Sequence, residues 1–149
     1  MMVEQRVSVS RVIKASPEAI FDVLADPARH ADFDGSGTVQ KVRGDATRLS
    51  LGAKFAMDMK LGPLRYKISS MVVEFQENEQ IAWAHFGKHR WRYELEATEV
   101  DGAPATNVTE TFDWSTARIP KAIELAGHPK RHPANMEATL LRLDALFEA

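Results

Sequence analysis

Residues 54–68 read KFAMDMKLGPLRYKI, and this stretch carries the clearest structural signal in the chain. Large apolar side chains alternate with polar or small ones through residues 54–61, and the alternation resumes at Leu64 after the turn signal Gly62-Pro63. A period of two is typical of β-strands, and two strands joined by so short a connection form an antiparallel hairpin. The stretch therefore predicts a hairpin at the centre of a β-rich fold.

The same pattern extends outward from this hairpin in both directions. Alternation predicts strands at residues 3–13, 38–43, 54–61, 64–75, 81–86, 90–97 and 106–115. The phase becomes ambiguous at Ser69-Ser70-Met71, which predicts a bulge or a sharp bend there. Strands that follow one another through short turns form one antiparallel sheet, here of about seven strands.

Two short helices are predicted after the first strand. Ser16-Pro17-Glu18 has the residue types of a helix start, because serine caps free amide groups and proline suits the first helical position. Asp26-Pro27 repeats this signature and starts a second helix that extends to about Ala31.

The last third of the chain changes to a helical period. Residues 119–126 predict a short helix, which the glycine and prolines of residues 127–133 interrupt. A long amphipathic helix is then predicted after Pro133 and up to the end of the chain, from the spacing of Met136, Leu140, Leu143 and Phe147. The whole pattern predicts a single α+β domain over residues 1–149, in which a curved antiparallel sheet wraps around the C-terminal helix.

Composition excludes several classes of function. The 149 residues include no cysteine, which excludes a disulfide scaffold, a thiolate metal site and a cysteine nucleophile. The formal net charge of −2 argues against nucleic acid as a partner. No apolar run exceeds the four residues of 81–84, so no membrane span is predicted, and the first residues lack the apolar segment of a signal peptide. We therefore expect a cytoplasmic protein.

At this point the chain resembles a known family, the START-like superfamily, also called SRPBCC or helix-grip proteins. Within it, the chain is most similar to bacterial proteins described as polyketide cyclase/dehydrase. The resemblance covers essentially the whole chain and rests on ASPEAIF (15–21), LADP (24–27), IAW (81–83), WRYEL (91–95), TETFDW (109–114) and NMEATLLRL (135–143). Phe33 departs from it, where relatives often have tryptophan, and so does the interrupted segment 127–133.

The resemblance implies a helix-grip fold with a deep apolar cavity between the sheet and the long helix. It does not imply one activity, because members of the superfamily bind lipids, sterols, hormones or polyketide intermediates, and some act on protein partners. In the hormone receptors among them, loops close over the ligand at turns that correspond to Leu61–Leu64 and Phe86–His89 here. These two turns are therefore candidate gates, with plain hairpins as the alternative reading.

The predicted inward face is rich in aromatic and methionine side chains, which suit the wall of a ligand cavity as well as a packed core. We predict that it binds a ligand through Phe55, Met57, Met59, Tyr66, Ile68, Trp83, Trp91, Tyr93, Phe112, Trp114, Met136 and Leu140. The alternative is that these side chains pack against one another and leave no space.

Ionisable residues share this apolar face. His85 lies on the face of Trp83, and Glu110 on the face of Phe112 and Trp114. Groups of this kind could anchor the polar end of a ligand or transfer a proton, so His85, Glu110 and Tyr93 are the candidate catalytic residues. Tyr66 and Tyr93 are candidate donors to a ligand carbonyl. The alternative places His85 and Glu110 at a sheet edge near water.

Other charged or metal-ligating residues receive a structural interpretation. His128 and His132 have the spacing of a helical metal pair, but Pro129 and Pro133 disfavour one regular helix through both, so no metal site is predicted. Glu94 and Glu96 are expected to face outward beside the arginines at 90 and 92, in a solvated charge ladder. Asp113 is expected to face solvent or a neighbouring strand. No phosphate-binding loop or nucleophile elbow occurs, and no cofactor is predicted.

Three functions remain open on this basis. The first is binding, transport or sensing of a small hydrophobic molecule such as a lipid, isoprenoid or polyketide. The second is a cyclase or dehydratase that works by general acid–base catalysis. The third is a protein-interaction module, which would present an exposed apolar patch on the outer sheet face or on the terminal helix. The sequence defines neither the ligand nor the oligomeric state.

Overall fold

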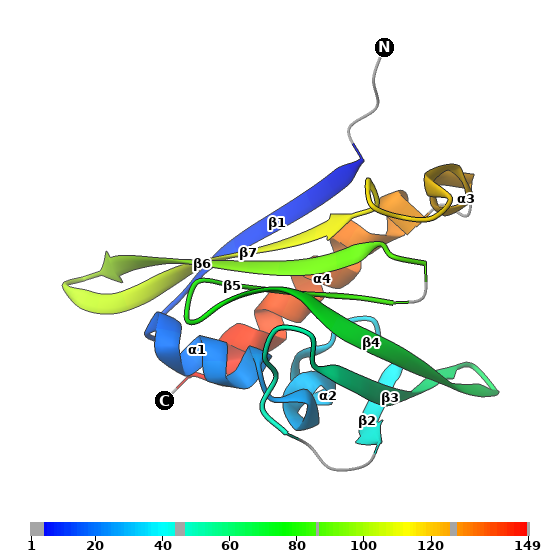
Figure 1. Cartoon of the computed structure of the whole chain (residues 1–149). Coiled ribbons are helices and arrows are strands. Elements are labelled where there is room, and N and C mark those ends of the chain that lie inside the picture. The colour runs from blue at the N-terminus through cyan, green and yellow to red at the C-terminus, as the bar shows by residue number, and fades with distance from the viewer. Residues whose placement is uncertain (1–4, 44–46, 86, 126–127, 149) are drawn as a thin grey trace.

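The computed structural model describes residues 5–43, 47–85, 87–125 and 128–148 (Figure 1). Its elements, in chain order, are β1 (Arg6–Ile13), α1 (Pro17–Leu24), the 3-10 turn η1 (Pro27–Arg29), α2 (His30–Phe33), β2 (Val39–Arg43), β3 (Lys54–Leu61), β4 (Leu64–Gln76), β5 (Gln80–Ala84), β6 (Arg90–Val100), β7 (Ala103–Asp113), α3 (Pro120–Leu125) and α4 (His128–Ala145). The predicted strand ends at residues 3, 4 and 86, and the predicted helix end at 126, lie outside the described residues.

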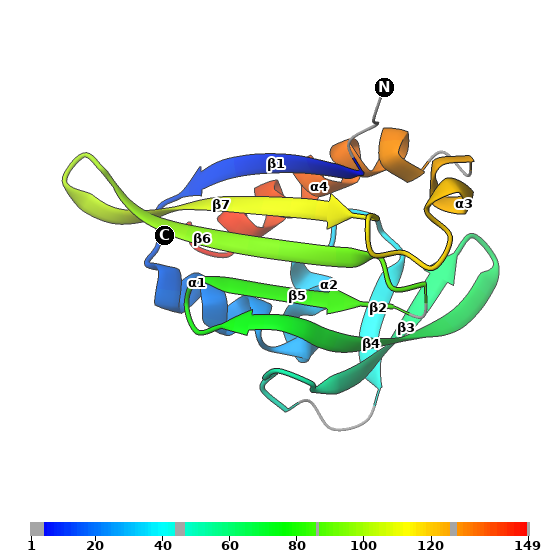
Figure 2. The ribbon, with the colours of Figure 1, turned by 45° about the horizontal axis from the view of Figure 1, so that its top comes forward.

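Seven strands form one antiparallel sheet in the order β1-β7-β6-β5-β4-β3-β2, as predicted (Figure 2). Each of β2 to β7 pairs with its neighbour in the sequence, and β1 returns to pair with β7. The hairpin predicted from residues 54–68 is present, because Leu61 pairs with Leu64 across the turn at Gly62-Pro63. Gly62 has a φ of 58°, a conformation that a residue without a side chain adopts at little cost.

The predicted bulge in β4 lies a few residues further along the strand. The alternation continues unbroken through Ser70, which is buried, and Met71, which is exposed. The register between β4 and β5 shifts between Val72 and Glu74 instead. After this shift, Phe75 faces the core, although it has the opposite parity from the buried Val72.

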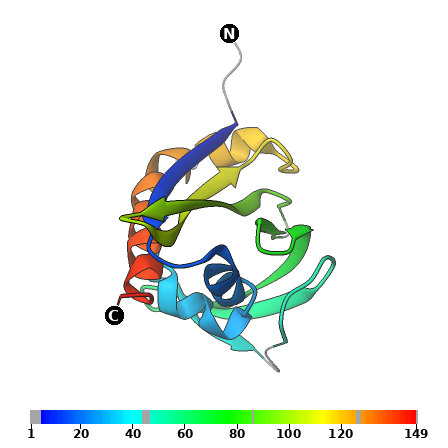
Figure 3. The same ribbon diagram turned by 90° about the vertical axis from the view of Figure 1, so that its left-hand side faces the viewer.

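The helix α4 lies across the concave face of the sheet, between β1 and α2. Figure 3 shows the sheet curling round, with α4 closing its open side and α1 almost end-on inside the curl. Leu140 and Leu143 of α4 are fully buried against residues such as Phe21 and Val108, so the helix supplies much of the core. The predicted helix-grip arrangement is confirmed.

The prediction that α4 starts after Pro133 is wrong, because the helix begins at His128 and contains Pro133. The proline at 129 lies in the first turn, where backbone N–H groups have no helical partner to lose. Pro133 lies one turn later, so it costs about one backbone hydrogen bond without ending the helix.

The two N-terminal helices start where their caps predict. The Ser16 hydroxyl accepts a hydrogen bond from the Ala19 N–H at 3.2 Å, and the Asp26 carboxylate accepts one from the Ala28 N–H at 3.0 Å. The second helix is tighter than predicted, because it begins as the 3-10 turn η1 and continues as one turn of α2 to Phe33. Among the described residues, no helix is long and apolar enough to cross a membrane.

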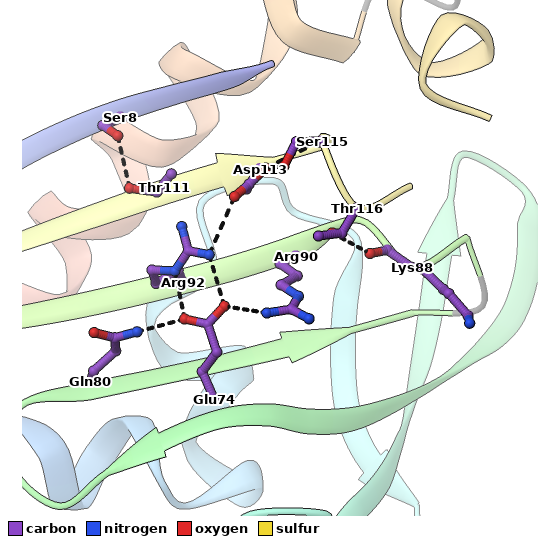
Figure 4. Close-up of polar contacts among 10 residues, drawn as sticks. All are labelled: Ser8, Glu74, Gln80, Lys88, Arg90, Arg92, Thr111, Asp113, Ser115 and Thr116. Atoms are coloured by element: carbon purple, nitrogen blue, oxygen red, sulfur yellow. Dashed lines mark hydrogen bonds and ion pairs between the residues drawn. The ribbon is translucent and has the colours of Figure 1, made fainter. Parts of the chain in front are cut away.

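The outer face of the sheet is polar and has a charged cluster at its centre (Figure 4). Glu74 accepts hydrogen bonds from Arg92 at 2.7 and 2.8 Å and from Arg90 at 2.7 Å, and Arg92 also contacts Asp113 at 3.3 Å. Glu74, Ala82 and Arg92 lie in one register across three strands, and the small alanine between them lets the two charges meet above it.

This cluster changes part of the predicted charge ladder. Glu94 and Glu96 are exposed on the outer face, as predicted, but the described arginine contacts are with Glu74 of β4 instead of with these two glutamates. The expectation for Asp113 is confirmed, since its carboxylate meets Arg92 on the neighbouring strand. The arginine hydrogen bonds lower the pKa of Glu74 to about 2 against the opposing effect of burial.

Candidate functional site

A cavity of about 870 Å³ lies between the concave face of the sheet and α4. This is the position that the sequence argument predicted, near Trp83, Trp91 and Met136, and all three line it. The residues predicted to bind a ligand that line this inner cavity are Met59, Tyr66, Ile68, Trp83, His85, Trp91, Tyr93, Glu110, Phe112 and Met136. A cavity of this size suits a small organic molecule.

Four of the predicted ligand-binding residues lie elsewhere. Met57 and Leu140 are buried in the core, 5% and 1% exposed, and do not line the inner cavity. Trp114 packs behind Phe112, with ring centroids 5.7 Å apart, and its indole N–H donates to Glu124 at 3.0 Å. Phe55 supports the wall from behind, in an edge contact with Trp83 at 5.8 Å. Strand phase identifies the inward face correctly, but it cannot separate the residues that reach the empty space from those packed beside it.

Glu110 is the most deeply buried carboxyl group of the inner cavity. It is 3% exposed and lies directly opposite Tyr93 in the pairing of β6 with β7. Burial raises the pKa of the Glu110 carboxyl well above its usual range, a hydrogen bond from Tyr93 opposes this rise, and the charge of Asp34 adds to it. The Oε1 atom has no hydrogen-bond partner among the described residues. Burial thus favours the neutral, protonated form of Glu110, and its Oε1 oxygen is available to a ligand.

Burial also suppresses the ionisation of Tyr93. The pKa of its hydroxyl rises well above 10, chiefly through burial and also through the charge of Glu110. The ring of Tyr93 is tilted against Trp83 with centroids 5.5 Å apart. Tyr93 and Glu110 thus form a pair of neutral polar groups set into an aromatic wall.

His85 follows the last residue of β5 and lies beside β4 in the wall of the inner cavity. Its Nδ1 atom lies 2.6 Å from the Ser70 hydroxyl of β4. Burial, with a smaller contribution from the nearby His89, lowers the pKa of His85 to about 4. His85 is therefore neutral at pH 7, and its ring is held in place by Ser70. The sequence prediction that it shares the inward face is confirmed.

His30 also lines the inner cavity, and the sequence argument missed it. Its ring is stacked on Trp83, with centroids 4.6 Å apart and planes at 23°. The Nε2 atom lies 2.9 Å from the Leu24 carbonyl oxygen, which can only accept, so Nε2 carries the proton. Burial lowers the pKa of His30 to about 4, and Nδ1 of the neutral ring is then an acceptor. One turn of helix has too few residues to show a period, so no sequence pattern pointed to this side chain.

One end of the inner cavity is closed by the segment after α2. The Gly35 N–H donates to the Thr139 hydroxyl of α4 at 2.9 Å, and Arg142 donates to the Asp34 carbonyl at 2.8 Å. A Cβ atom on Gly35 would lie 2.5 Å from the Thr139 nitrogen and 2.6 Å from the Asn135 carbonyl oxygen. Glycine is therefore required for this close approach to the helix backbone.

Two more histidines complete the wall on the side of α4. The His132 ring contacts Phe112 at 4.5 Å and Trp91 at 4.8 Å, and the His89 ring contacts Phe112 at 5.4 Å. Within the described ranges, no group of three or more His, Cys, Asp or Glu side chains is placed to hold a metal ion. The side chain of His128 lies outside the described residues, so the prediction that His128 and His132 form no metal site is not tested.

The first candidate gate is next in sequence to residues of the inner cavity. Leu61 at the end of β3 and Ile123 of α3 line the inner cavity, as does Tyr66, which is 36% exposed, and Leu64 beside the turn is 59% exposed. The turn at Gly62-Pro63 thus follows a residue of the cavity wall, and its role as a gate stays a prediction. From the second candidate gate, Gly87 and His89 line the inner cavity, whereas Phe86 lies outside the described residues.

Comparisons with known proteins agree with this architecture. A family model described as polyketide cyclase / dehydrase and lipid transport matches residues 4–148. An uncharacterised protein of Mycobacterium tuberculosis, Rv0088, is 40% identical over 142 residues, which cover 93% of this chain and 62% of that protein. The chain thus spans less than two thirds of the length of this relative.

Solved structures with low sequence identity share the fold. The protein NE0264 of Nitrosomonas europaea has a TM-score of 0.73 at 15% identity, with 98% of this chain and 96% of that one covered. An AHSA1-like protein of Aeromonas hydrophila has a TM-score of 0.61 at 19% identity, with 94% and 90% covered.

Proposed function

Because the chain belongs to the polyketide cyclase / dehydrase and lipid transport family, we propose that it binds a small hydrophobic molecule in its inner cavity. Lipids, isoprenoids and polyketides are the ligand classes that fit a space of about 870 Å³ whose wall combines aromatic and methionine side chains with buried polar groups. Burial of apolar ligand surface supplies the driving force, at about 25 cal/mol per Å². The proposal takes residues 1–149 as one binding domain, and we further propose that it works in the cytoplasm.

The buried carboxyl of Glu110, whose Oε1 atom has no hydrogen-bond partner among the described residues, is the observation that carries this proposal. A buried polar atom without a partner costs free energy in the empty protein, and a ligand that hydrogen-bonds to it removes that cost. The protonated acid donates to a ligand hydroxyl or carbonyl oxygen, with Tyr93 beside it. The apolar part of the ligand then lies against Trp83, Trp91 and Met136.

Native mass spectrometry of the purified protein tests this proposal. We expect an adduct that is released by organic solvent and identified as a hydrophobic molecule with one polar end. The Ile68→Trp variant adds bulk inside the inner cavity and should lose the adduct. The matched control is Ile119→Trp, at a site 66% exposed and not part of the inner cavity wall, which should retain it. Equal retention by both variants would contradict the proposal.

A second candidate function is catalysis, and the protonation state of Glu110 favours it. A buried carboxyl group whose pKa is raised can act as a general acid, and the neutral His85 can accept a proton through Nδ1 or Nε2. These are the two roles that a dehydration requires. Incubation of the extracted molecule with the protein should then give a product lighter by one water. Glu110→Gln should return the molecule unchanged, whereas equal turnover by wild type and variant would remove Glu110 from the reaction.

The third reading, a protein-interaction module, has less support. The outer face of the sheet carries the Glu74 cluster instead of an apolar patch. Leu141 of α4 and Leu146, the residue after its end, are exposed, but five positions at helical geometry correspond to about 140° of rotation, so they do not share one face.

A further inference from the structure

A second cavity, of about 910 Å³, lies on the outer side of the sheet where the sheet splits. The strand β5 ends at Ala84, so the first half of β4, residues 64–70, pairs with β3 but has no partner from β5. The hollow at this split is the outer cavity. Its lining comes from the ends of β2 and β5, the start of β3, the middle of β4, the start of β6, and residues 85, 88, 116 and 118.

The outer cavity is strongly cationic. Among the described residues, its lining includes Arg43, Lys54, Lys88, Arg90 and Arg118, and no aspartate or glutamate. Asp58 and Glu74 lie outside the lining, and each bonds one of its arginines, Arg43 and Arg90 respectively, at 2.7 Å. The ammonium groups of Lys54 and Lys88 have no ion-pair partner within the described part of the chain.

The backbone at Lys88 is held in an unfavourable conformation. Its φ of 66° lies in the left-handed region, which costs free energy for a residue with a side chain. Two hydrogen bonds hold it there: the Thr116 hydroxyl donates to the Lys88 carbonyl at 2.8 Å, and the Arg118 N–H donates to the Gly87 carbonyl at 2.8 Å. Figure 4 shows Lys88 and Arg90 extending on the outer side of the sheet, beside the end of β5. Strain that is retained in this way is typical of binding sites.

We propose that the outer cavity binds a phosphate group. Several Lys and Arg donors that converge on one hollow, with the hydroxyls of Ser69 and Thr116 in the same wall, suit the charge and the acceptor oxygens of a phosphate. This inference goes beyond the proposed function, and its failure leaves the proposal for the inner cavity intact. Arg90 lines the outer cavity, and its hydrogen bond to Glu74 holds its guanidinium group in position.

The outer and inner cavities share part of their walls. Ser69 and His85 line both. A phosphate group in the outer cavity could therefore belong either to a soluble phosphate ester or to an amphiphile whose apolar chain occupies the inner cavity. The chemistry of recognition is the same in both cases, and the experiment distinguishes the two sources.

Isothermal titration calorimetry in a phosphate-free buffer tests the proposal with three probes. These are inorganic phosphate, glycerol 3-phosphate, and lysophosphatidic acid below its micelle concentration. We expect at least one probe to bind in a salt-sensitive way. The double variant Lys54→Gln/Lys88→Gln should weaken that binding about tenfold or more, because it removes two charge-assisted contacts. The control Lys14→Gln/Lys121→Gln makes the same change of charge at positions outside both cavities and should bind as wild type does.

The variants also separate the two sources of the phosphate. If only lysophosphatidic acid binds, and Ile68→Trp as well as the lysine pair weakens it, the phosphate belongs to an amphiphile. If glycerol 3-phosphate binds and Ile68→Trp leaves its affinity unchanged, the phosphate belongs to a soluble ester. Absence of binding by all three probes would overturn the proposal, and so would an equal loss in both lysine variants.

Discussion

Glu110 combines deep burial with an oxygen that has no partner, and this combination makes a pH prediction. Its pKa is raised in the folded protein, so the folded state holds a proton that the unfolded state releases above its ordinary value near 4.5. Stability from this group is therefore complete below about pH 4.5 and falls as the pH rises, by about 1.4 kcal/mol per pH unit.

Glu110→Gln should remove this decline, because glutamine has a similar shape and does not ionise. His30 and His85, whose pKa values are lowered to about 4, have the opposite effect but only below about pH 6.5. The histidines no longer contribute above about pH 6.5, so in the window from there to the raised pKa of Glu110 the variant should gain stability relative to wild type in urea unfolding as the pH rises. A margin that stays constant across this window would show that Glu110 is ionised in the fold.

For single residues, the sequence predicts the direction of side chains on strands better than that of side chains in short helices. Alternation places Glu110, His85 and Tyr93 on the inward face, because a period of two fixes direction from one residue to the next. His30 lies in a single helical turn, where no period can be measured. The pairing of Glu110 with Tyr93 depends on strand register, which alternation does not specify.

The contact between the segment after α2 and the helix α4 depends on one glycine. Gly35→Ala should cost about 3 kcal/mol in urea unfolding, because its Cβ atom would meet the backbone of α4 at Asn135 and Thr139. Gly37→Ala is the control, since its φ is 75° and nothing lies within 4 Å of an added Cβ. That control should cost only about 1 kcal/mol. Equal losses of stability in the Gly35→Ala and Gly37→Ala variants would contradict the view that the contact with α4 requires glycine at position 35.

The outer face of the sheet depends on the Glu74 cluster, which joins β4 to β6 across β5. Glu74→Gln should destabilise the protein by about 2 kcal/mol at pH 7, because it leaves Arg92 half-buried without its main partner. The pKa of Glu74 is lowered to about 2, so its contribution is complete above about pH 4.5 and is lost as the pH falls toward 2. The stability curves of wild type and variant should converge there.

Asp58→Asn is the control for this cluster, because its pair with Arg43 lies at the surface. The control should change stability by less than about 1 kcal/mol. A loss at Asp58 as large as that at Glu74 would contradict the view that burial makes the Glu74 cluster important.

The elements themselves could largely be predicted from the sequence. The strands and the capped starts at Ser16 and Asp26 depend on local residue types, and the structure has them where expected. The sequence does not predict the position of the bulge after Val72 or the continuation of α4 through Pro133, because both depend on tertiary contacts. Ser70, for example, is a polar residue that faces inward, where its hydroxyl lies beside His85. A polar residue on the inward face makes the alternation look broken before the register shift that follows Val72.

In the whole molecule, the curved sheet wraps around the helix α4, and the inner cavity lies between them. The sequence predicts the two rows of aromatic and methionine side chains, but whether these rows touch depends on the curvature of the sheet and on how far α4 stands from it. Residues such as Gly35 and Thr139 set that spacing, and no local pattern identifies them. Whether a cavity forms therefore depends on how the sheet and α4 are placed relative to each other.

The methionines of this chain allow the most direct test of ligand binding. Met59 and Met136 line the inner cavity, whereas Met57 is packed in the core and Met71 faces the outer side. Carbon-13 labelling of methionine methyl groups reports on all four in one NMR spectrum. Farnesol, an isoprenoid alcohol with one polar end, is the probe. We predict saturable shifts of the Met59 and Met136 signals with those of Met57 and Met71 unchanged; shifts confined to Met71, or none from farnesol or from the molecule extracted with the protein, would contradict a ligand-binding cavity.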